Sequence, residues 1–437
     1  MSTREQIIQA DLTYVGDAFV PDVQVAVDSG GRILRVGALG TTPSLVLRDR
    51  ALLPGMINAH SHAFQRGMRG HGEVFPWERM RDDSGARGDF WSWREAMYRL
   101  VLDMNVDRMY DLSRAAYEEM LAAGITTVGE FHYLHHDADT DTWTLDEPLL
   151  AAARDAGIRL VLLYTYYRTG GISQPLSPAQ RRFHTASPSA YWRRVDEIAA
   201  RLDPDTQTIG AVVHSVRAAS LDDLAEIHAE SKRRRMPFHM HVEEQVREIQ
   251  DCRAAYDMTP MRAVLSRVEV DDRFTSVHCT HTDPADMSEY LAAGGRVCLC
   301  PLTEANLGDG VADVPHILER NGCVAIGSDL NSRLCMSEEL RLVEYAQRLI
   351  RQRRGIVADD GGRIGAPLFR MATLHGAESL AAPAGVIERG RLADFFTLDL
   401  TCPTLAGWTA ETLLETFIFG AGNEAVREVC VGGRWRR

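Results

Sequence analysis

The sequence predicts an α/β fold, a (β/α)8 barrel joined to a small β-sandwich that both termini build. Short apolar runs alternate with helical segments through the middle of the chain, as in parallel sheets with helical crossovers. The segments at the two ends instead have the pattern of short strands with glycine turns. We therefore place the sandwich at residues 1–51 and 386–437 and the barrel at residues 52–385, a length that suits one barrel with insertions.

The expected elements follow one another along this frame. The terminal strands are Ile7–Tyr14, Val23–Asp28, Ile33–Gly37, Gly390–Phe396 and Val426–Trp435. The apolar runs that predict the barrel strands are Leu52–Ile57, Thr126–Phe131, Leu160–Tyr166, Ile209–His214, Pro237–Val242, Thr275–His278, Arg296–Cys300 and Cys323–Ile326. Helical patterns between them include Met109–Ala123, Leu221–Arg235 and Glu338–Arg351. The segment Glu73–Asp89 is rich in Gly, Asp and Arg and predicts a long loop.

Composition and charge exclude several classes of protein. A net charge of -13 argues against a nucleic-acid partner. No apolar run approaches the roughly 18 residues of a membrane span, and the N-terminal segment lacks the apolar core of a signal peptide. The 8 cysteines follow no paired spacing, so we expect reduced, buried thiols rather than a disulfide framework. We therefore expect a cytoplasmic protein without a membrane partner.

The most informative motif is His60-Ser61-His62, directly behind the first apolar run of the predicted barrel. Strand side chains repeat every second residue, so both imidazoles point to the same side. His241, His278 and Asp329 also stand at or just past the ends of apolar runs. Imidazoles together with a carboxylate are a typical ligand set for a borderline metal such as zinc. The pattern predicts a metal-dependent hydrolase.

Further polar residues follow the strand ends, where barrel enzymes carry their catalytic groups. A single histidine of this kind is more often a structural residue, and it is their recurrence at equivalent positions that supports a site. These additional residues are His132, Tyr133, His214 and His239. For His135-His136-Asp137, adjacent histidines point to different sides, so we expect a solvated or supporting role.

Three charged residues complete the predicted site. Glu244 follows His241 by three residues, and a carboxylate beside metal-activated water is a natural proton shuttle. Glu244 would also suit the first turn of a helix, a structural role that does not exclude the catalytic one. Arg217 follows a strand, and Arg94 lies in an aromatic stretch. Arginines near a metal pocket commonly bind carboxylates through two parallel hydrogen bonds, the alternative being surface ion pairs.

Two segments, PGMINAHSH (54–62) and GVIERGRLADF (385–395), resemble the amidohydrolase superfamily. More narrowly, the chain resembles the formimidoylglutamate deiminases of histidine degradation. The motifs that carry this likeness are HSHAFQR (60–66), FWSWREAMYRL (90–100), GEFHYLHHD (129–137), HSVRA (214–218), HVEEQ (241–245), VHCTH (277–281) and LTEANLGDG (302–310). The loops at 168–171 and 330–333 depart from the family pattern, and we expect both near the mouth of the pocket.

The resemblance implies a role for each site residue. One zinc ion per chain would be held by His60, His62, His241 and Asp329. Glu244, His278 and Asp329 would serve the attacking water and the leaving group. The substrate would be held by Gln65, Arg94, Tyr133, His214 and Arg217. The implied reaction is hydrolysis of N-formimidoyl-L-glutamate, a small dicarboxylate amidine, to N-formyl-L-glutamate and ammonia, and we also expect a homodimer.

Two other functions stay open at this point. One is deamination of another amidine, a guanidine compound, or a purine- or pterin-like substrate by the same superfamily chemistry. Two arginines in a polar pocket argue against a flat neutral heterocycle, which would favour aromatic stacking instead. The other is a metal-binding protein without catalysis on the same barrel, but none of the expected ligands, and not Glu244, is missing.

Overall fold

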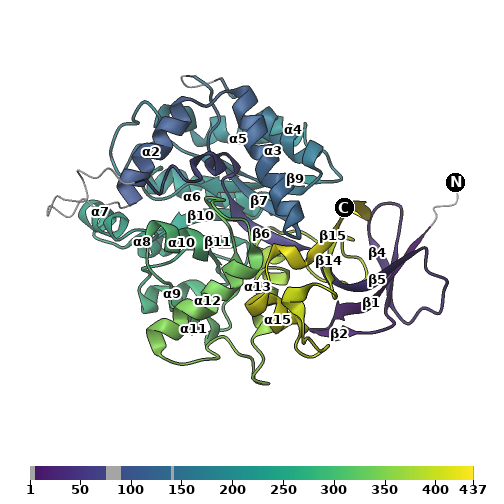
Figure 1. Cartoon of the computed structure of the whole chain (residues 1–437). Coiled ribbons are helices and arrows are strands. Elements are labelled where there is room, and N and C mark those ends of the chain that lie inside the picture. Colours follow the sequence, from purple (N-terminus) through teal and green to yellow (C-terminus); the bar gives the residue numbers. More distant parts are fainter. Residues whose placement is uncertain (1–4, 75–89, 139–141, 437) are drawn as a thin grey trace.

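The computed structural model describes residues 5–74, 90–138 and 142–436. It consists of a barrel of parallel strands surrounded by helices and a separate mixed sheet at one side, built from both termini (Figure 1). The predicted fold class is therefore confirmed. No helix in the described ranges is both long enough and apolar enough to cross a membrane. Most of the predicted loop Glu73–Asp89 lies outside the described residues.

The barrel strands pair in parallel and in the order in which they occur along the chain. Several are buried along their whole length because helices cover the outside and side chains fill the interior. These strands are β6 (Met56–Ser61), β7 (Ile125–His132), β8 (Arg159–Tyr166), β9 (Gln207–Val213), β10 (Phe238–Val242), β11 (Phe274–His278), β12 (Arg296–Leu299) and β13 (Val324–Ile326).

The barrel closes between β6 and the end of the short strand β13. The backbone N–H groups of Ser328 and Asp329 both donate to the carbonyl of His60 at 3.0 Å. The N–H of His62 donates in turn to the carbonyl of Asp329 at 3.0 Å. The seam therefore holds three candidate site residues in fixed register by backbone hydrogen bonds alone.

Helices connect the strands and cover the barrel. Their starts carry the expected caps, because the side chains of Asn105, Ser220 and Thr259 accept backbone hydrogen bonds in the first turns of α3, α6 and α8. The helices are α2 (Phe90–Leu102), α3 (Val106–Ala122), α4 (Asp146–Ala156), α5 (Pro188–Ala199), α6 (Leu221–Arg234), α7 (Val246–Tyr256), α8 (Pro260–Arg267), α9 (Pro284–Ala292), α10 (Pro301–Leu307), α11 (Val314–Leu318), α12 (Met336–Arg351), α13 (Gly365–Met371), α14 (Leu374–Ser379) and α15 (Leu413–Gly420). Short 3-10 helices are η1 (Ala63–Met68), η2 (Gln180–Phe183), η3 (Pro403–Leu405) and η4 (Asn423–Ala425).

The terminal sheet has one face on the barrel and one on a core of its own. In β14, Phe395 lies in the sheet's own core and Phe396 in the core shared with the barrel, as the alternation of strand side chains requires. Backbone hydrogen bonds between residues 31–33 and 391–393 bring distant parts of the sheet together over that small core. Its strands are β1 (Gln6–Val15), β2 (Ala18–Val20), β3 (Gln24–Val27), β4 (Ile33–Gly37), β5 (Leu45–Pro54), β14 (Phe395–Asp399), β15 (Val426–Val431) and β16 (Arg434–Arg436).

One predicted strand is wrong in detail. The apolar run Leu52–Ile57 is two strands, because β5 of the terminal sheet ends at Pro54 and β6 of the barrel begins at Met56. Gly55 lies between them, where an added Cβ would come within 2.1 Å of Thr126 Oγ1, so the chain passes close to β7 at this point. The end of β5 and the start of β6 are both buried, so the sequence stays apolar where the chain passes from the terminal sheet into the barrel. The proposed boundary at 51/52 consequently assigns Leu52–Pro54 to the barrel.

Candidate active site

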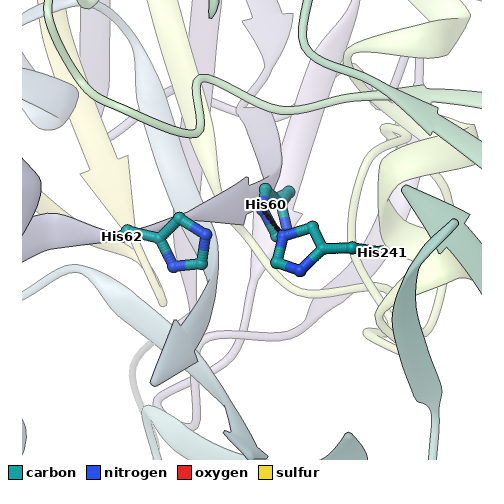
Figure 2. Close-up of side chains that lie close together, drawn as sticks. All are labelled: His60, His62 and His241. Carbon is teal, nitrogen blue, oxygen red and sulfur yellow. Dashed lines mark hydrogen bonds between the residues drawn. The ribbon is translucent and has the colours of Figure 1, made fainter. Parts of the chain in front are cut away.

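Three predicted metal ligands meet at the C-terminal end of the barrel. His60 lies in β6, His62 directly follows it, and His241 lies in β10. Figure 2 shows their rings facing one another, with His60 Nε2 and His241 Nε2 3.1 Å apart. One ring nitrogen from each of the three lies within 4.8 Å of the other two.

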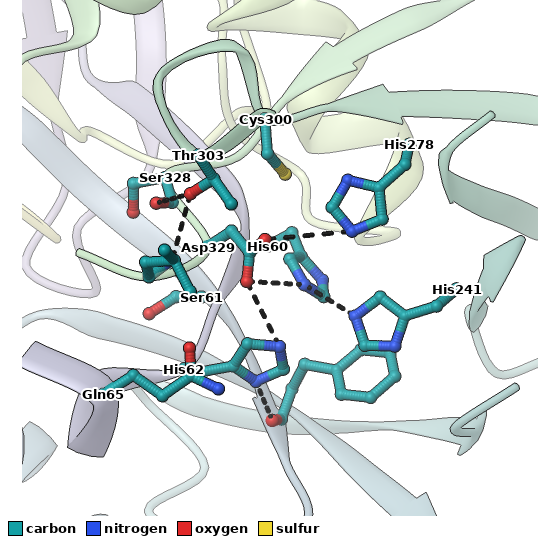
Figure 3. Close-up of polar contacts among 12 residues, drawn as sticks. His60, Ser61, His62, Gln65, His241, His278, Cys300, Thr303, Ser328 and Asp329 are labelled. Carbon is teal, nitrogen blue, oxygen red and sulfur yellow. Dashed lines mark hydrogen bonds and ion pairs between the residues drawn. The ribbon is translucent and has the colours of Figure 1, made fainter. Parts of the chain in front are cut away.

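Asp329 joins this group from the other side of the barrel seam (Figure 3). Its Oδ1 lies 3.6 Å from His60 Nε2 and 3.3 Å from His62 Nε2. Its Oδ2 lies 3.8 Å from Nε2 of His278, which ends β11. Asp329 and His278 both have left-handed backbones, with φ of 47° and 75°. Such conformations are costly for residues other than glycine and are commonly found at functional sites.

In a neutral imidazole, the nitrogen that donates a hydrogen bond leaves the other nitrogen with a free lone pair. His62 Nδ1 donates to the carbonyl of Phe131 at 2.8 Å, and His241 Nδ1 donates to the carbonyl of His214 at 3.1 Å. Carbonyl oxygens only accept, so the Nε2 atoms of these two rings are left as acceptors.

Charge reinforces this arrangement. Burial lowers the pKa of His60 and His241 well below the usual value and that of His62 to about 3, so all three rings are neutral. The Nε2 acceptors of His62 and His241 and the Asp329 carboxylate thus converge, with His60 Nε2 in hydrogen-bond contact with His241 Nε2 at 3.1 Å. Three neutral imidazoles and a carboxylate are a donor set that fits a divalent cation such as zinc.

Two titratable groups lie beside this ligand set. Glu244 Oε1 is 3.8 Å from His278 Nε2, and burial raises the pKa of Glu244 to about 7. Burial opposes protonation of His278, but the carboxylates of Glu244, Glu304 and Asp329 raise its pKa to about 10. Glu244 precedes Gln245, the N-cap of α7, and lines the pocket. The predicted structural role, a carboxylate within the first turn of the helix, is therefore wrong.

A cavity with about 630 Å³ of empty space opens above the histidines. Gln65 and Tyr133 lie in its wall, where Gln65 Nε2 donates to Tyr133 Oη at 2.7 Å, while Gln65 Oε1 is buried without a partner among the residues that the structure describes. The predicted site residues that line this one cavity are His62, Gln65, Arg94, Tyr133, His214, Arg217, His241, Glu244, His278 and Asp329. His60 lies beneath them, fully buried.

The two predicted arginines lie on the same wall. Arg217 Nη2 is 3.7 Å from Glu244 Oε2, and Arg217 Nε is 3.5 Å from Glu248 Oε1. Among the described residues its Nε makes no hydrogen bond that meets the usual geometry, and its buried charge is balanced by these two glutamates. The guanidinium of Arg94 lies 4.3 Å from the centre of the Trp91 ring. The aromatic stretch thus supports this guanidinium, as predicted, through cation–π contact.

Three other predicted histidines point elsewhere. His239 is two residues nearer the start of β10 than His241, and its Nε2 donates to the carbonyl of Ser379 at 2.9 Å. His132 and His135 both contact the Asp146 carboxylate at 2.9 Å, and neither lines the pocket. Of the solvated or supporting role expected for the 135–137 segment, the solvated one is wrong for its histidines, since His135 and His136 are fully buried.

Sequence reasoning also missed part of the site. Glu304 contacts His278 Nδ1 at 3.4 Å, although its motif LTEANLGDG was used only for the resemblance. Tyr98 and Tyr167 line the cavity. Tyr98 could have been predicted from the sequence. It follows Arg94 by four residues, and residues four apart on a helix lie on the same face. The loops at 168–171 and 330–333, which differ from the family pattern, both reach the pocket, through Gly170 and Leu330.

Comparison with known sequences gives a consistent result. The model of the Amidohydrolase family matches residues 51–436. A formimidoylglutamate deiminase from Pseudomonas aeruginosa is 40% identical over 392 residues, which cover 88% of this chain and 84% of that protein. A 5-methylthioadenosine/S-adenosylhomocysteine deaminase from Natronomonas pharaonis is 26% identical over 99% of this chain and 90% of its own length.

Solved structures share the whole fold. The crystal structure of an amidohydrolase from Brucella melitensis superposes with a TM-score of 0.88 at 33% identity, covering 98% of this chain and 94% of that one. An adenosine deaminase from Xanthomonas campestris, described with bound zinc, gives a TM-score of 0.78 at 22% identity, covering 98% and 92%. At that lower identity the likeness concerns the fold alone.

Proposed function

The chain belongs to the amidohydrolase family, and from that premise we propose that it is a zinc-dependent deiminase of N-formimidoyl-L-glutamate. The proposed products are N-formyl-L-glutamate and ammonia. A relative at 40% identity carries the name of this activity, which supports the assignment. We further propose that the enzyme acts in histidine degradation in the cytoplasm, where its free cysteines suit a reducing environment, and that it forms a homodimer.

One observation carries the proposal: a histidine–carboxylate cluster and two arginines line the same cavity. Formimidoylglutamate combines an amidine carbon, which needs an activated water, with two carboxylates, which need cations. Arg94 and Arg217 supply planar donors that match carboxylate geometry. A neutral heterocycle would leave both arginines without an anionic partner from the substrate, so this pocket favours the dicarboxylate over a purine or pterin.

We assign one zinc ion per chain to His60, His62, His241 and Asp329. Zinc at such a site supplies Lewis-acid activation of the attacking water at neutral pH. A second ion would need a further bridging ligand, such as a lysine or carboxylate at the end of the fourth barrel strand. β9 ends at Val213 and is followed by His214 and Ser215, which offer no such group.

The side chains divide the proton transfers between them. His278 and Asp329 orient the water, and the Asp329 carboxylate takes its proton as its oxygen bonds to the amidine carbon. Glu244, with a pKa of about 7, delivers a proton to the terminal nitrogen. Starting from the protonated amidine, the attacked carbon bears a hydroxyl and an NH2 group, which the proton from Glu244 converts to NH3+. The bond from carbon to that nitrogen then breaks while the hydroxyl returns its remaining proton to Glu244, ammonia leaves, and the carbon remains bonded to the glutamate nitrogen as a formyl group.

The pocket wall holds the rest of the substrate. Arg94 and Arg217 bind its carboxylates and align the amidine carbon over the ligand cluster. Gln65 Oε1, buried without a partner, accepts a hydrogen bond from the substrate, and Tyr133 and His214 complete the wall. Gly170 and Leu330, from the two loops that differ from the family pattern, line the same cavity.

A panel of amidines tests the proposal. Ammonia release is measured with formimidoylglutamate, with formamidine, which has no carboxylate, and with a guanidine and a purine nucleoside. We expect formimidoylglutamate to have the highest kcat/KM by a wide margin. A higher kcat/KM for the purine nucleoside would overturn the proposal in favour of the heterocycle deaminase.

A further inference from the structure

The four histidines of the site differ in what their outward-facing nitrogens contact. His62 and His241 donate to backbone carbonyls. His60 Nδ1 has no hydrogen-bond partner among the described residues. His278 alone directs its outer nitrogen at a carboxylate, with Nδ1 3.4 Å from Glu304 Oε1. This distinction separates His278 from the three rings that we assign to the metal.

Glu304 is itself held in place. It lies in α10 and is buried, and its Oε1 also accepts the backbone N–H of Cys300 at 2.9 Å. The same oxygen therefore connects the start of a helix to the imidazole of His278. An acceptor that is fixed by backbone can fix a ring in turn.

We propose that Glu304 is a positioning residue for the deimination reaction. It holds the ring by its Nδ1–H and directs Nε2 towards the cavity, where Glu244 and Asp329 both lie 3.8 Å away. The left-handed backbone of His278, with φ of 75°, needs such support, because a strained residue persists only where its surroundings hold it. The catalytic part of this inference rests on the proposed function; the orientation of the ring does not.

A second buried glutamate offers a matched control. Glu339 accepts the backbone N–H of Leu302 at 2.8 Å, so it supports the same first turn of α10. It is as thoroughly buried as Glu304. It does not contact His278 in any hydrogen bond or ion pair of the described residues. Leucine at either position removes one bond to the helix start, but only the change at Glu304 removes the partner of His278.

The experiment compares Glu304→Leu, Glu304→Gln and Glu339→Leu as zinc-loaded proteins, with zinc content and melting temperature measured for each. We expect Glu304→Leu to lose about 10- to 100-fold in kcat, as is typical when the outer partner of a site histidine is removed, with KM and zinc content kept. Glu304→Gln still presents an acceptor oxygen and should recover most of that loss. Glu339→Leu should keep the kcat of the wild type even if its melting temperature falls as far.

Imidazole ¹⁵N shifts provide a readout that needs no substrate. With His278 assigned from a His278→Asn variant, the wild type should show an Nδ1–H signal shifted by a hydrogen bond to a carboxylate, and Glu304→Leu should lose that shift. The inference is overturned if the His278 signals are the same in both proteins, or if Glu339→Leu loses as much kcat as Glu304→Leu. Failure of the proposed function is a separate result, since the wild type would then turn over no formimidoylglutamate while the ¹⁵N comparison still decides the role of Glu304.

Discussion

Two buried histidine–carboxylate clusters in this barrel have nearly the same composition and opposite properties. The pocket cluster consists of His60, His62, His241 and Asp329, and it faces the cavity. The network cluster consists of His132, His135 and Asp146, and it lies outside the cavity lining. In the pocket cluster, one ring nitrogen from each of the three histidines lies within 4.8 Å of the other two. In the network cluster, the same holds for one ligand atom from each of its three residues.

In the network cluster both oxygens of the carboxylate already have donors. Asp146 Oδ1 accepts from His132 and His135, and Oδ2 accepts from Tyr164 and Arg194, all at 2.9 Å. The Arg194 cation also balances the carboxylate charge. These partners hold the pKa of Asp146 below its usual range although burial opposes them. Such a network stiffens the ends of β7 and β8 and leaves the carboxylate no lone pair for an ion, although His132 Nδ1 has no partner among the described residues.

In the pocket cluster the acceptors converge, and among the described residues no arginine is bonded to the carboxylate. Hydrogen bonds on the far sides of His62 and His241 leave their Nε2 atoms as acceptors, and Asp329 adds an oxygen beside them. The comparison teaches that residue types alone do not make a metal site. The direction of the lone pairs, and whether a cation is already present, decide between a ligand set and a structural network.

The largest expected effect comes from breaking the pocket cluster. His241→Ala should lose both zinc and turnover, because the remaining ligands cannot complete the coordination shell. Asp329→Asn should abolish turnover as well. Metal analysis and ammonia release measure both effects. A fully zinc-loaded His241→Ala protein with near-normal turnover would remove His241 from the ligand set.

Glu244→Gln should separate proton transfer from metal binding. The amide is nearly isosteric, so zinc should stay at one equivalent. The rate should fall by about 10²- to 10⁴-fold, the usual contribution of a general acid–base group. Turnover within a few-fold of the wild type would mean that Glu244 carries no proton in the reaction.

Arg94→Met and Arg217→Met should weaken only the recognition of the dicarboxylate. Each change keeps bulk but removes a charge-assisted contact worth about 1.5–3 kcal/mol, which corresponds to a loss of about 10- to 100-fold in kcat/KM. Toward formamidine both variants should match the wild type. Wild-type kinetics with formimidoylglutamate in both variants would contradict the two-carboxylate pocket.

The smallest effect on turnover should come from the network cluster. Asp146→Asn leaves His135 and Arg194 without their buried counter-charge, and breaking a buried pair of this kind costs about 3–5 kcal/mol of stability. Zinc content and kcat at low temperature should nevertheless stay at wild-type values. A wild type that binds two zinc ions and an Asp146→Asn variant that binds one would show that the network cluster is a metal site after all.

The sequence predicted the barrel and the metal candidates because both depend on local pattern. Apolar runs mark buried strands, and the HxH spacing places His60 and His62 on one side of a strand. The change of sheet at Gly55 stayed hidden because the residues on both sides of it are buried. Nor could local pattern separate His241 from His239, which share a strand face and differ only in what lies opposite them. The network cluster and Glu304 depend on contacts across the fold, which no spacing in the sequence encodes.

The most direct test of the central claim follows one substrate through zinc removal and return. The protein is incubated with N-formimidoyl-L-glutamate as purified, after chelation, and after addition of one equivalent of zinc per chain, and all products are quantified. We predict ammonia and N-formyl-L-glutamate in equal amounts, turnover lost on chelation, and turnover restored by the single equivalent. Formation of glutamate and formamide instead, undiminished turnover in the zinc-free protein, or a requirement for a second equivalent would contradict the account.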